Sequence, residues 1–338
     1  MAVCKAEIMK AKGGAGAIGT LTFDDGVSTT SNKLRELMEE YGLVATLMIV
    51  PTRIMAEPPY SKGYSDIDEL NRLMVGGYID IESHSYSHLY IAEEGHVDYK
   101  PENCNDENRY RETYGSLLWL KEHFPGKHFV AFGVPGGNYD EKSHEYLKKY
   151  FYSVRNSWRS DLLQSLTPPD NREHGGWYKL IRMGLSEAKI DNAMDYLDRC
   201  VKGEGWFIGA CHNIVGIELG KHNYQITVET LSILLKEMAR LRDEGKLWPA
   251  SFGDATRYLR EYEASTVKAE LSFDKIEVSV NMKSQTPSGL PLDKDIFNFP
   301  LTVKVYIPDG YKAENSKDGY VLIDVKPNDK ATISICKI

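Results

Sequence analysis

The sequence predicts an α/β fold, either a (β/α) barrel or a doubly wound sheet, followed by a small antiparallel β-sandwich. Over the first 262 of its 338 residues, strand-like runs alternate with helix-like segments. This order is typical of a parallel sheet covered by helices. After about residue 265 the pattern changes to period-two alternation separated by turn residues, which is typical of short antiparallel strands. We therefore predict two domains, residues 1–262 and 265–338.

The elements of the first region follow from apolar periodicity and from helix start and stop signals. The run VATLMIV at 44–50 is apolar throughout, as expected of a strand buried on both faces. Ser31 or Asn32 is a possible N-cap of the first helix, and Gly42 ends it. In order, the predicted elements are strand 18–23, helix 31–41, strand 44–50, helix 66–75, strand 78–83, helix 106–123, strand 128–134, helix 140–150, strand 151–157, helix 191–201, strand 205–213, helix 227–245, strand 246–252 and a last helix ending near 262.

The second region contains four segments of period-two alternation. Turn sequences rich in Pro, Gly, Asn and Asp separate several of them, and no helical pattern intervenes. The predicted strand segments are 268–283, 300–308, 319–327 and 330–338.

Composition limits the classes of function. Hydrophobic residues make up 42% and charged residues 27% of the chain, as in an ordinary globular protein. The formal charge of -8 argues against a nucleic-acid-binding protein, which would normally carry a basic face. No apolar run has the length of a membrane span, and the first twenty residues lack a signal-peptide apolar stretch. From these features we expect either a cytosolic chain or one from which a leader was removed.

Several polar residues come directly after predicted strands. They are Asp24 and Asp25, His84, the turn at 135–137, and His212. In a barrel of parallel strands the chemistry sits at the C-terminal ends of the strands. We therefore expect these residues to gather at one end of the fold.

The stretch TLTFDDG places Asp24 and Asp25 side by side at a strand end. Two adjacent carboxylates repel each other unless a positive charge lies nearby. A divalent cation would supply that charge, with one Asp binding the ion and the other acting as a base. The alternative interpretation is a turn with two solvated aspartates, because Asp-Gly is a common turn sequence.

The stretch IESHSYSHLY places His84 and His88 four residues apart. If a helical turn begins after Ser83, both imidazoles project from one face and can bind one metal ion. The alternative is that two histidines merely share a helix surface.

Taken together, TFDDG and HSYSH resemble the first two motifs of the NodB-homology polysaccharide deacetylases, carbohydrate esterase family four. AFGVPGGNYD at 131–140 is similar to the family's third motif, and FIGACHNI at 207–214 to its fifth. The resemblance covers about residues 15–262, and the C-terminal sandwich lies outside it.

The resemblance implies a distorted (β/α) barrel of about seven strands and metal-dependent removal of N-acetyl groups from the amino sugars of a poly- or oligosaccharide. It implies a divalent metal, most often zinc, and a localisation outside the cytoplasm if a leader was removed. The implied metal ligands are Asp25, His84 and His88. The implied catalytic groups are Asp24 as base, His212 as acid and the backbone N–H of Gly136 as oxyanion donor, with Pro135 and Trp158 as substrate contacts.

The sequence also departs from the family pattern. Gly133 stands where the third motif often carries an arginine that pairs with the base, so Arg155 and Arg182 become candidates for that partner. An ordinary scaffold role is the alternative for both arginines. The family's Asp-Trp pair has no clear counterpart near Trp158. Two other functions stay open: hydrolysis of a small cyclic amide or imide on the same metal site, and non-catalytic carbohydrate binding.

Overall fold

The computed structural model describes residues 2–55, 63–157, 159, 161–170, 174–215 and 225–338. By contacts the chain divides into two compact units. One is Ala17–Thr256. The other combines Met1–Gly16 with Arg257–Ile338. Each unit is described separately below.

The first unit is built on a nine-stranded sheet whose strand pairings are all parallel. Along the sheet the order is β8-β7-β6-β5-β4-β3-β10-β9, and β13 also pairs with β3. The strands are β3 (Ala17–Asp24), β4 (Ala45–Ile49), β5 (Ile79–Ser83), β6 (Ala131–Gly133), β7 (Ser153–Ser157), β8 (Leu180–Ile181), β9 (Met183–Gly184), β10 (Trp206–Cys211) and β13 (Leu247–Pro249).

This sheet is nearly closed. Strands β8 and β9 end the path on opposite sides, yet only Arg182 separates them in the chain. Every residue of β3, β4 and β10 is buried, which is the pattern of strands covered on both faces. The structure therefore confirms the predicted distorted (β/α) barrel and not the alternative, a doubly wound sheet.

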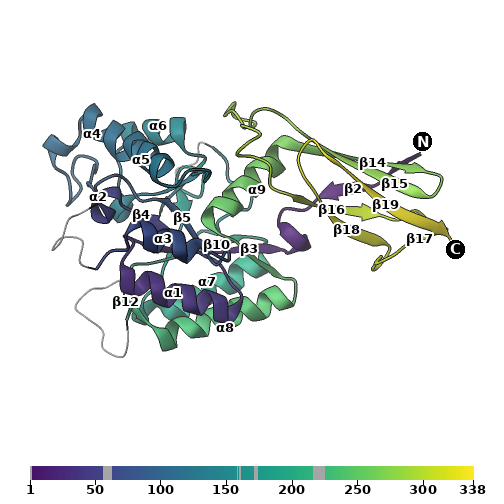
Figure 1. Ribbon diagram of the computed structural model, residues 1–338, viewed down its shortest axis with the longest axis horizontal. Coiled ribbons are helices and arrows are strands. Elements are labelled where there is room, and N and C mark those ends of the chain that lie inside the picture. Colours follow the sequence, from purple (N-terminus) through teal and green to yellow (C-terminus); the bar gives the residue numbers. More distant parts are fainter. Residues whose placement is uncertain (1, 56–62, 158, 160, 171–173, 216–224) are drawn as a thin grey trace. The chain divides into compact units, whose positions relative to one another are not determined.

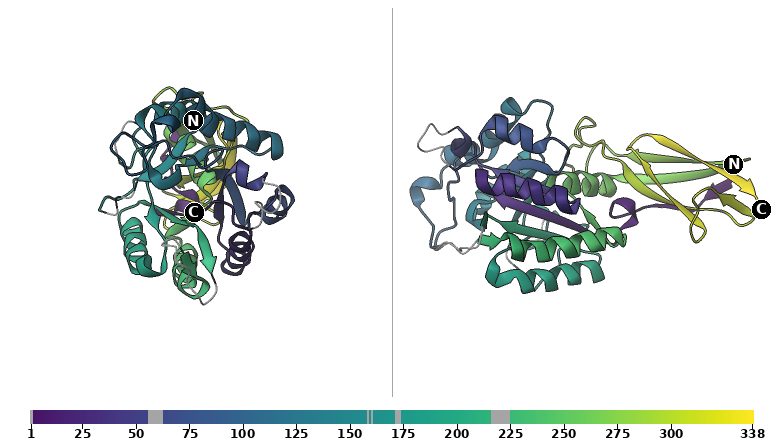
Figure 2. Two further views of the ribbon diagram at one scale, coloured as in Figure 1. Left: turned by 90° about the vertical axis from the view of Figure 1, so that its left-hand side faces the viewer. Right: turned by 60° about the horizontal axis from the view of Figure 1, so that its bottom comes forward.

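Helices stand around the outside of the sheet (Figure 1; Figure 2, left). Helix α8 shows why: its buried residues Leu231, Leu234, Leu235, Met238 and Leu241 recur at helical spacing and form one apolar stripe. The helices are α1 (Ser28–Tyr41), α2 (Pro51–Ile54), α3 (Ile67–Met74), α4 (Asp106–Tyr110), α5 (Ser116–His123), α6 (Glu141–Tyr150), α7 (Ile190–Lys202), α8 (Val228–Asp243) and α9 (Phe252–Ala264). A π-helical turn, Arg111–Gly115, joins α4 to α5, and the short strands β11 (Asn213–Val215) and β12 (Gln225–Thr227) pair with each other.

Two local expectations differ from the structure. Helix α1 begins at Ser28 with Val27 at the N-cap, so Ser31 and Asn32 are its fourth and fifth residues and neither caps it. The Ser31 hydroxyl instead bonds back to the Val27 carbonyl. The strand predicted over 128–134 shortens to the three residues of β6.

The second unit contains two antiparallel sheets, as the period-two pattern predicted. One has the order β1-β14-β15-β19-β17 and the other β18-β16-β2. Alternate residues such as Ile276, Val278 and Val280 are buried, which matches one apolar face per strand. The strands are β1 (Ala2–Cys4), β2 (Ala6–Ile8), β14 (Ser265–Ser272), β15 (Lys275–Met282), β16 (Leu301–Tyr306), β17 (Tyr311–Ala313), β18 (Tyr320–Val325) and β19 (Lys330–Lys337).

The N-terminal residues divide differently from the predicted ranges 1–262 and 265–338. Strand β1 pairs with β14 and β2 pairs with β16, so residues 1–16 belong with the sandwich by contacts. Each of these two strands is only three residues long. Such short strands carry too little alternation to be recognised, and their pairing depends on partners about 270–300 residues away in the chain.

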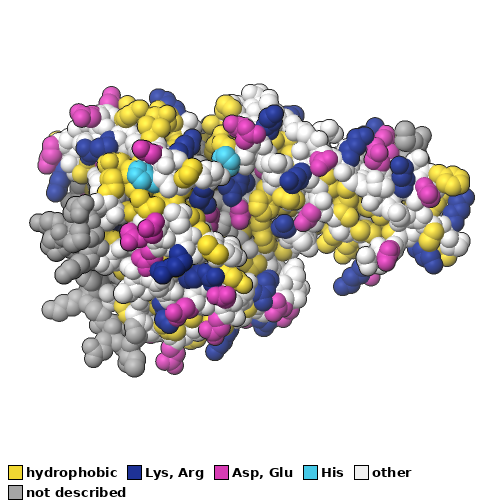
Figure 3. Space-filling model, in the orientation of Figure 1, with side chains coloured by type: hydrophobic (Ala, Val, Ile, Leu, Met, Phe, Trp, Pro, Cys, Tyr) yellow, Lys and Arg dark blue, Asp and Glu magenta, His cyan; other side chains and the backbone are white. Residues whose placement is uncertain are grey.

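Charged side chains of both signs are interspersed on the face shown in Figure 3. Among the described residues, none of the helices has both the length and the apolarity needed to span a bilayer.

Candidate active site

Asp24 is the last residue of β3, and Asp25 follows it in a tight turn. The N–H of Asp25 donates to the carbonyl of Met48 at 3.0 Å, which ties the turn to β4. Asp25 and Gly26 have φ angles of 79° and 72°, a left-handed conformation that Asp and Gly tolerate better than most residues. The Asp24 side chain is 3% exposed and that of Asp25 17%. The turn therefore holds two largely buried carboxylates at the C-terminal end of a barrel strand.

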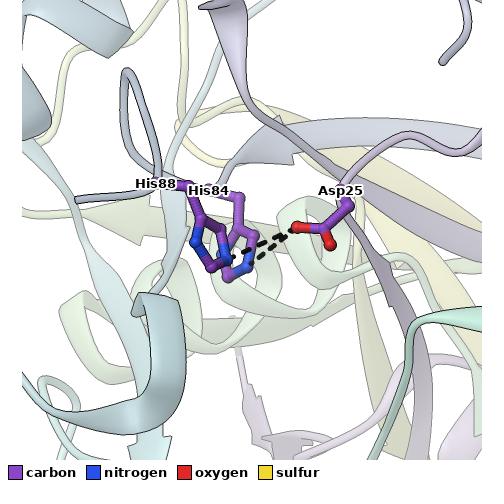
Figure 4. Close-up of side chains that lie close together, drawn as sticks. All are labelled: Asp25, His84 and His88. Atoms are coloured by element: carbon purple, nitrogen blue, oxygen red, sulfur yellow. Dashed lines mark ion pairs between the residues drawn. The ribbon is translucent and has the colours of Figure 1, made fainter. Parts of the chain in front are cut away.

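His84 follows β5, and its ring is oriented by a backbone group. Its Nδ1 lies 2.7 Å from the carbonyl oxygen of Gly133. A carbonyl can only accept, so Nδ1 carries the proton and Nε2 keeps its lone pair. Nε2 is buried and has no hydrogen-bond partner among the described residues. Figure 4 shows it directed toward Asp25. A backbone acceptor on one nitrogen with a free lone pair on the other is the usual arrangement of a metal-binding histidine.

The segment from His84 to His88 is an irregular loop, so the expected helical turn is wrong. Ser85 and His88 have φ angles of 67° and 61°, which no α-helix accommodates. Buried Glu112 holds the loop instead, because its carboxylate accepts from the Ser87 N–H at 2.8 Å and from the Ser87 hydroxyl at 2.7 Å. The His88 N–H donates to Ser85 Oγ at 3.0 Å.

The loop nevertheless brings both imidazoles to Asp25. His88 Nε2 lies 3.5 Å and His84 Nε2 3.8 Å from Asp25 Oδ1 (Figure 4). One ligand atom from each of these three residues lies within 4.8 Å of the others. Metal–ligand bonds of roughly 2 Å place neighbouring ligand atoms somewhat more than about 3 Å apart. The two imidazoles and one carboxylate therefore fit a single divalent ion with small adjustments.

Asp24 has a buried partner, Arg155 from β7. Arg155 is fully buried, and its Nη2 forms an ion pair with Asp24 Oδ1. Residues 133 and 155 are paired neighbours in the sheet. A Cβ on Gly133 would lie 2.9 Å from Arg155 Nη2 and 3.0 Å from its Cζ. The glycine at the motif's arginine position therefore leaves the space that the guanidinium of the neighbouring strand occupies.

His212 follows β10 and reaches the same carboxylate from the other side. Its Nε2 lies 4.0 Å from Asp24 Oδ2, and its side chain is 27% exposed. His84 Nε2 lies 3.7 Å from Asp24 Oδ2. Asp24 is thus bordered by Arg155, His84 and His212.

These surroundings set the charges of the site. Burial alone would raise the pKa of Asp24, but Arg155, followed by His84, His212 and the second candidate arginine, Arg182, holds that pKa well below its ordinary range. Burial lowers the pKa of His84 to about 3, although Asp24 acts in the opposite direction. Burial likewise lowers the pKa of His88. Near pH 7 the site therefore has an ionised Asp24 and two neutral imidazoles that can act as ligands.

Gly136 lies in the turn Pro135–Gly137 after β6 and has a φ of 64°. A Cβ at this position would clash with the ring of Tyr90, with Cδ1 only 2.9 Å away. The same ring stands edge-on to His88, with centroids 5.4 Å apart. Tyr90 therefore links the Gly136 turn to the histidine loop. Pro135 is buried, and Trp158 lies outside the described residues.

A cavity of about 500 Å³ adjoins this turn. Its volume is in the range of ligand pockets, about 300–1,000 Å³. The lining is mainly polar and comprises Glu93, Glu94, Gly95, His96, Gly136, Gly137, Asn138, Tyr139, His144, Asn156, Arg159, His174 and Lys179.

Arg53 in α2 is a charged neighbour that the sequence analysis did not identify. Its Nη1 forms an ion pair with Asp25 Oδ1. The repulsion between adjacent carboxylates was a signal that cations should be sought at the ends of neighbouring strands. Arg53 lies four residues after the end of β4, which neighbours β3 in the sheet.

Comparison with known proteins adds a sequence match and several structural likenesses. The sequence pattern of the polysaccharide deacetylase family matches residues 14–154. A search of curated proteins gave no significant match. A deacetylase from Streptococcus pyogenes, solved with acetate, shares 14% identity with a TM-score of 0.35, over 40% of this chain and 54% of its own.

Two further structures show the range of the likeness. A polysaccharide deacetylase from Bacillus cereus shares 20% identity with a TM-score of 0.36, over 48% of this chain and 45% of its own. A proposed polysaccharide deacetylase from Mycobacterium smegmatis shares 13% identity with a TM-score of 0.47, over 77% of this chain and 95% of its own.

The matched segment contains Asp24, Asp25, His84, His88 and Gly136, whereas Arg155 and His212 lie beyond its end. The resemblance inferred from TFDDG and HSYSH is therefore confirmed: residues 14–154 carry the sequence pattern of the polysaccharide deacetylase family.

Proposed function

We propose that this protein is a metal-dependent hydrolase that removes N-acetyl groups from the amino sugars of a poly- or oligosaccharide. The observation that carries the proposal is the convergence of Asp25, His84 and His88 beside a second, ionised carboxylate, Asp24. Non-catalytic carbohydrate binding does not require a cluster of metal-ligating side chains beside a base. The family match over residues 14–154 supports the substrate class.

Asp25, His84 and His88 would hold the ion. Two imidazoles and one carboxylate suit zinc, and three protein ligands leave positions open for other groups. When bound, a divalent ion supplies a Lewis acid that polarises the acetyl oxygen and makes water more acidic.

The remaining roles belong to side chains around Asp24. Its carboxylate takes a proton from the attacking water, and Arg155 keeps that carboxylate ionised until it does so. His212 gives a proton to the departing nitrogen, since an imidazole changes charge near neutrality. The Gly136 N–H acts as a backbone donor to the oxyanion, and Pro135 beside it contacts the substrate.

The test is acetate release from chitin oligosaccharides and peptidoglycan fragments, with elemental analysis of the same preparation. We expect about one zinc ion per chain, as for a three-ligand site, and activity that a chelator removes and zinc restores. Asp24→Asn should keep the metal and lose at least about a hundredfold in kcat, because the amide cannot take a proton. Asp161→Asn, a change at an exposed carboxylate, is the matched control and should leave both unchanged.

Other results would point to the other functions. Bound metal without acetate release from any glycan would favour a small cyclic amide or imide as substrate. Absence of both metal and acetate, even with zinc added, would leave carbohydrate binding without catalysis. If Asp24→Asn kept full activity, Asp24 would not be the general base.

A further inference from the structure

One oxygen of Asp25 faces three basic groups. Asp25 Oδ1 forms an ion pair with Arg53 Nη1 and lies 3.5 Å and 3.8 Å from the Nε2 atoms of His88 and His84. The oxygen directed toward both imidazoles therefore also carries a guanidinium.

The guanidinium is held in this position by its surroundings. Pro51 begins α2 two residues after the end of β4, and the N–H of Thr52 donates to the Tyr86 carbonyl at 3.1 Å. The guanidinium carbon of Arg53 lies 5.3 Å from the centroid of the Tyr64 ring, within the range of a cation–π contact. The Arg53 and Asp25 side chains are only 25% and 17% exposed. Solvent therefore screens their attraction incompletely, and arginine does not lose its proton in proteins.

Each carboxylate of the site has a counter-charge without any added cation. Asp24 pairs with Arg155 and Asp25 pairs with Arg53, and Arg182 is a further positive charge that acts on Asp24. The like-charge repulsion that a bare Asp-Asp pair would create is thus already compensated. Arg155 acts on the proposed base, whereas Arg53 acts on a proposed metal ligand.

We propose that Arg53 competes with the divalent cation for Asp25 and thereby sets the metal affinity of the site. A cation bound at Asp25 must share its oxygen with a fixed positive charge, which weakens binding and favours exchange of the ion. In return, the site keeps its fold when the metal is absent. The inference rests on the proposed metal site but concerns a residue outside its ligand set.

The direct test is zinc affinity, measured by competition with a chromophoric chelator. Arg53→Gln removes the competing charge, and we expect zinc to bind at least about tenfold more tightly, the lower end of the effects of groups that contact metal ligands. Arg53→Lys keeps the charge and should stay within a few-fold of the wild type. Arg72→Gln, which removes a 70% exposed charge paired with Glu69, is the control for net charge and should have no effect.

Melting temperatures supply a second measurement that does not depend on activity. Without zinc, Arg53→Gln should melt below the wild type because Asp25 has lost its counter-charge. Saturating zinc should then raise its melting temperature by more than it raises that of the wild type.

Unchanged or weaker zinc binding by Arg53→Gln would overturn the proposal; weaker binding would mean that Arg53 orients Asp25 for the metal. His84→Ala separates this failure from failure of the site itself. If His84→Ala binds zinc as tightly as the wild type, the proposed metal site is wrong. If His84→Ala loses zinc while Arg53→Gln binds it normally, only the role of Arg53 is wrong.

Discussion

Each of the two adjacent carboxylates at the end of β3 has its own arginine. Arg155 reaches Asp24 from β7, and Arg53 reaches Asp25 from α2. A buried carboxylate that lacked such a partner would take up a proton rather than stay ionised. At the scale of single residues, the charge states of this site therefore depend on guanidinium groups as much as on the carboxylates and histidines.

Arg155→Leu tests this dependence through pH. Without Arg155, burial dominates and the pKa of Asp24 rises, so the acid limb of kcat/KM should move to higher pH. The wild-type carboxylate has a lowered pKa and contributes stability above its ordinary pKa of about 4, lost as the pH falls. In the variant the sign reverses, and stability should fall as the pH rises above about 4. Removing one partner of a buried pair should also cost about 3–5 kcal/mol near neutral pH.

Urea unfolding at several pH values, together with the pH–rate profile, would measure both effects. Arg155→Lys keeps the positive charge but not the planar guanidinium, and it should shift the pH–rate profile less than Arg155→Leu does. An acid limb that stays in place in Arg155→Leu would show that Arg155 does not keep Asp24 ionised.

Gly136→Ala tests the turn that carries the proposed oxyanion donor. The added methyl group would occupy a left-handed position and clash with the Tyr90 ring. We expect a loss of about 1–3 kcal/mol in stability and a clear fall in kcat. The double variant Gly136→Ala with Tyr90→Ala should recover part of the stability because it removes the clash but not the strain. If the stability losses of the two single variants simply added in the double variant, the Tyr90 ring would not be what excludes a side chain at residue 136.

At the scale of elements, the site is made by the loops that follow the barrel strands. The turn after β3 and the loop after β5 both contain non-glycine residues with positive φ. Such conformations are costly in isolation and persist where neighbouring structure holds them. Glu112, in the π-helical turn between α4 and α5, is the group that holds the histidine loop.

Glu112→Gln tests that support. With its oxygen accepting from the Ser87 N–H, the amide can still donate to the Ser87 hydroxyl, which turns to accept. The amide nitrogen cannot accept, so the bond from Arg111 Nε to Glu112 Oε1 at 3.1 Å and the negative charge of this buried group are lost. We expect a cost of about 1–3 kcal/mol in stability and roughly ten- to hundredfold weaker zinc binding. Chelator competition and urea unfolding would measure these values, with Glu107→Gln on the exposed side of α4 as the control. Unaltered zinc affinity would show that the loop does not need Glu112.

At the scale of the whole molecule, every proposed ligand and catalytic residue belongs to the unit Ala17–Thr256. Zinc should therefore stabilise that unit alone, by about 4 kcal/mol at a thousand times the dissociation constant. Val303→Ala, a change at a fully buried residue of the sandwich unit, should destabilise only the other unit by about 1–3 kcal/mol.

Differential scanning calorimetry of the full chain would show whether two transitions exist. We expect zinc to raise one of them and Val303→Ala to lower the other. If both changes moved a single transition, the two units would unfold together.

Features that repeat along the chain could be predicted from the sequence. The alternation of strands and helices indicated the barrel, and the period-two runs indicated the sandwich, because apolar periodicity reflects which face of an element is buried. Asp24, Asp25, His84 and His212 could be expected at one end of the fold because each follows a predicted strand. In the structure, Asp25 lies beside both His84 and His88.

The sequence offered Arg155 only as one of two candidate partners of Asp24, and the tertiary structure decided which distant residues surround that cluster. Arg155 lies 131 positions from Asp24 in the sequence, and neither its pairing nor the contacts of Arg53, Glu112 and Tyr90 leave any periodic trace. The irregular histidine loop and the pairing of the N-terminal strands with the sandwich likewise could not be predicted from a periodic pattern. The physical reason is that ion pairs, steric contacts and strand pairing depend on distance in space, whereas a sequence pattern records only which face of each element is buried.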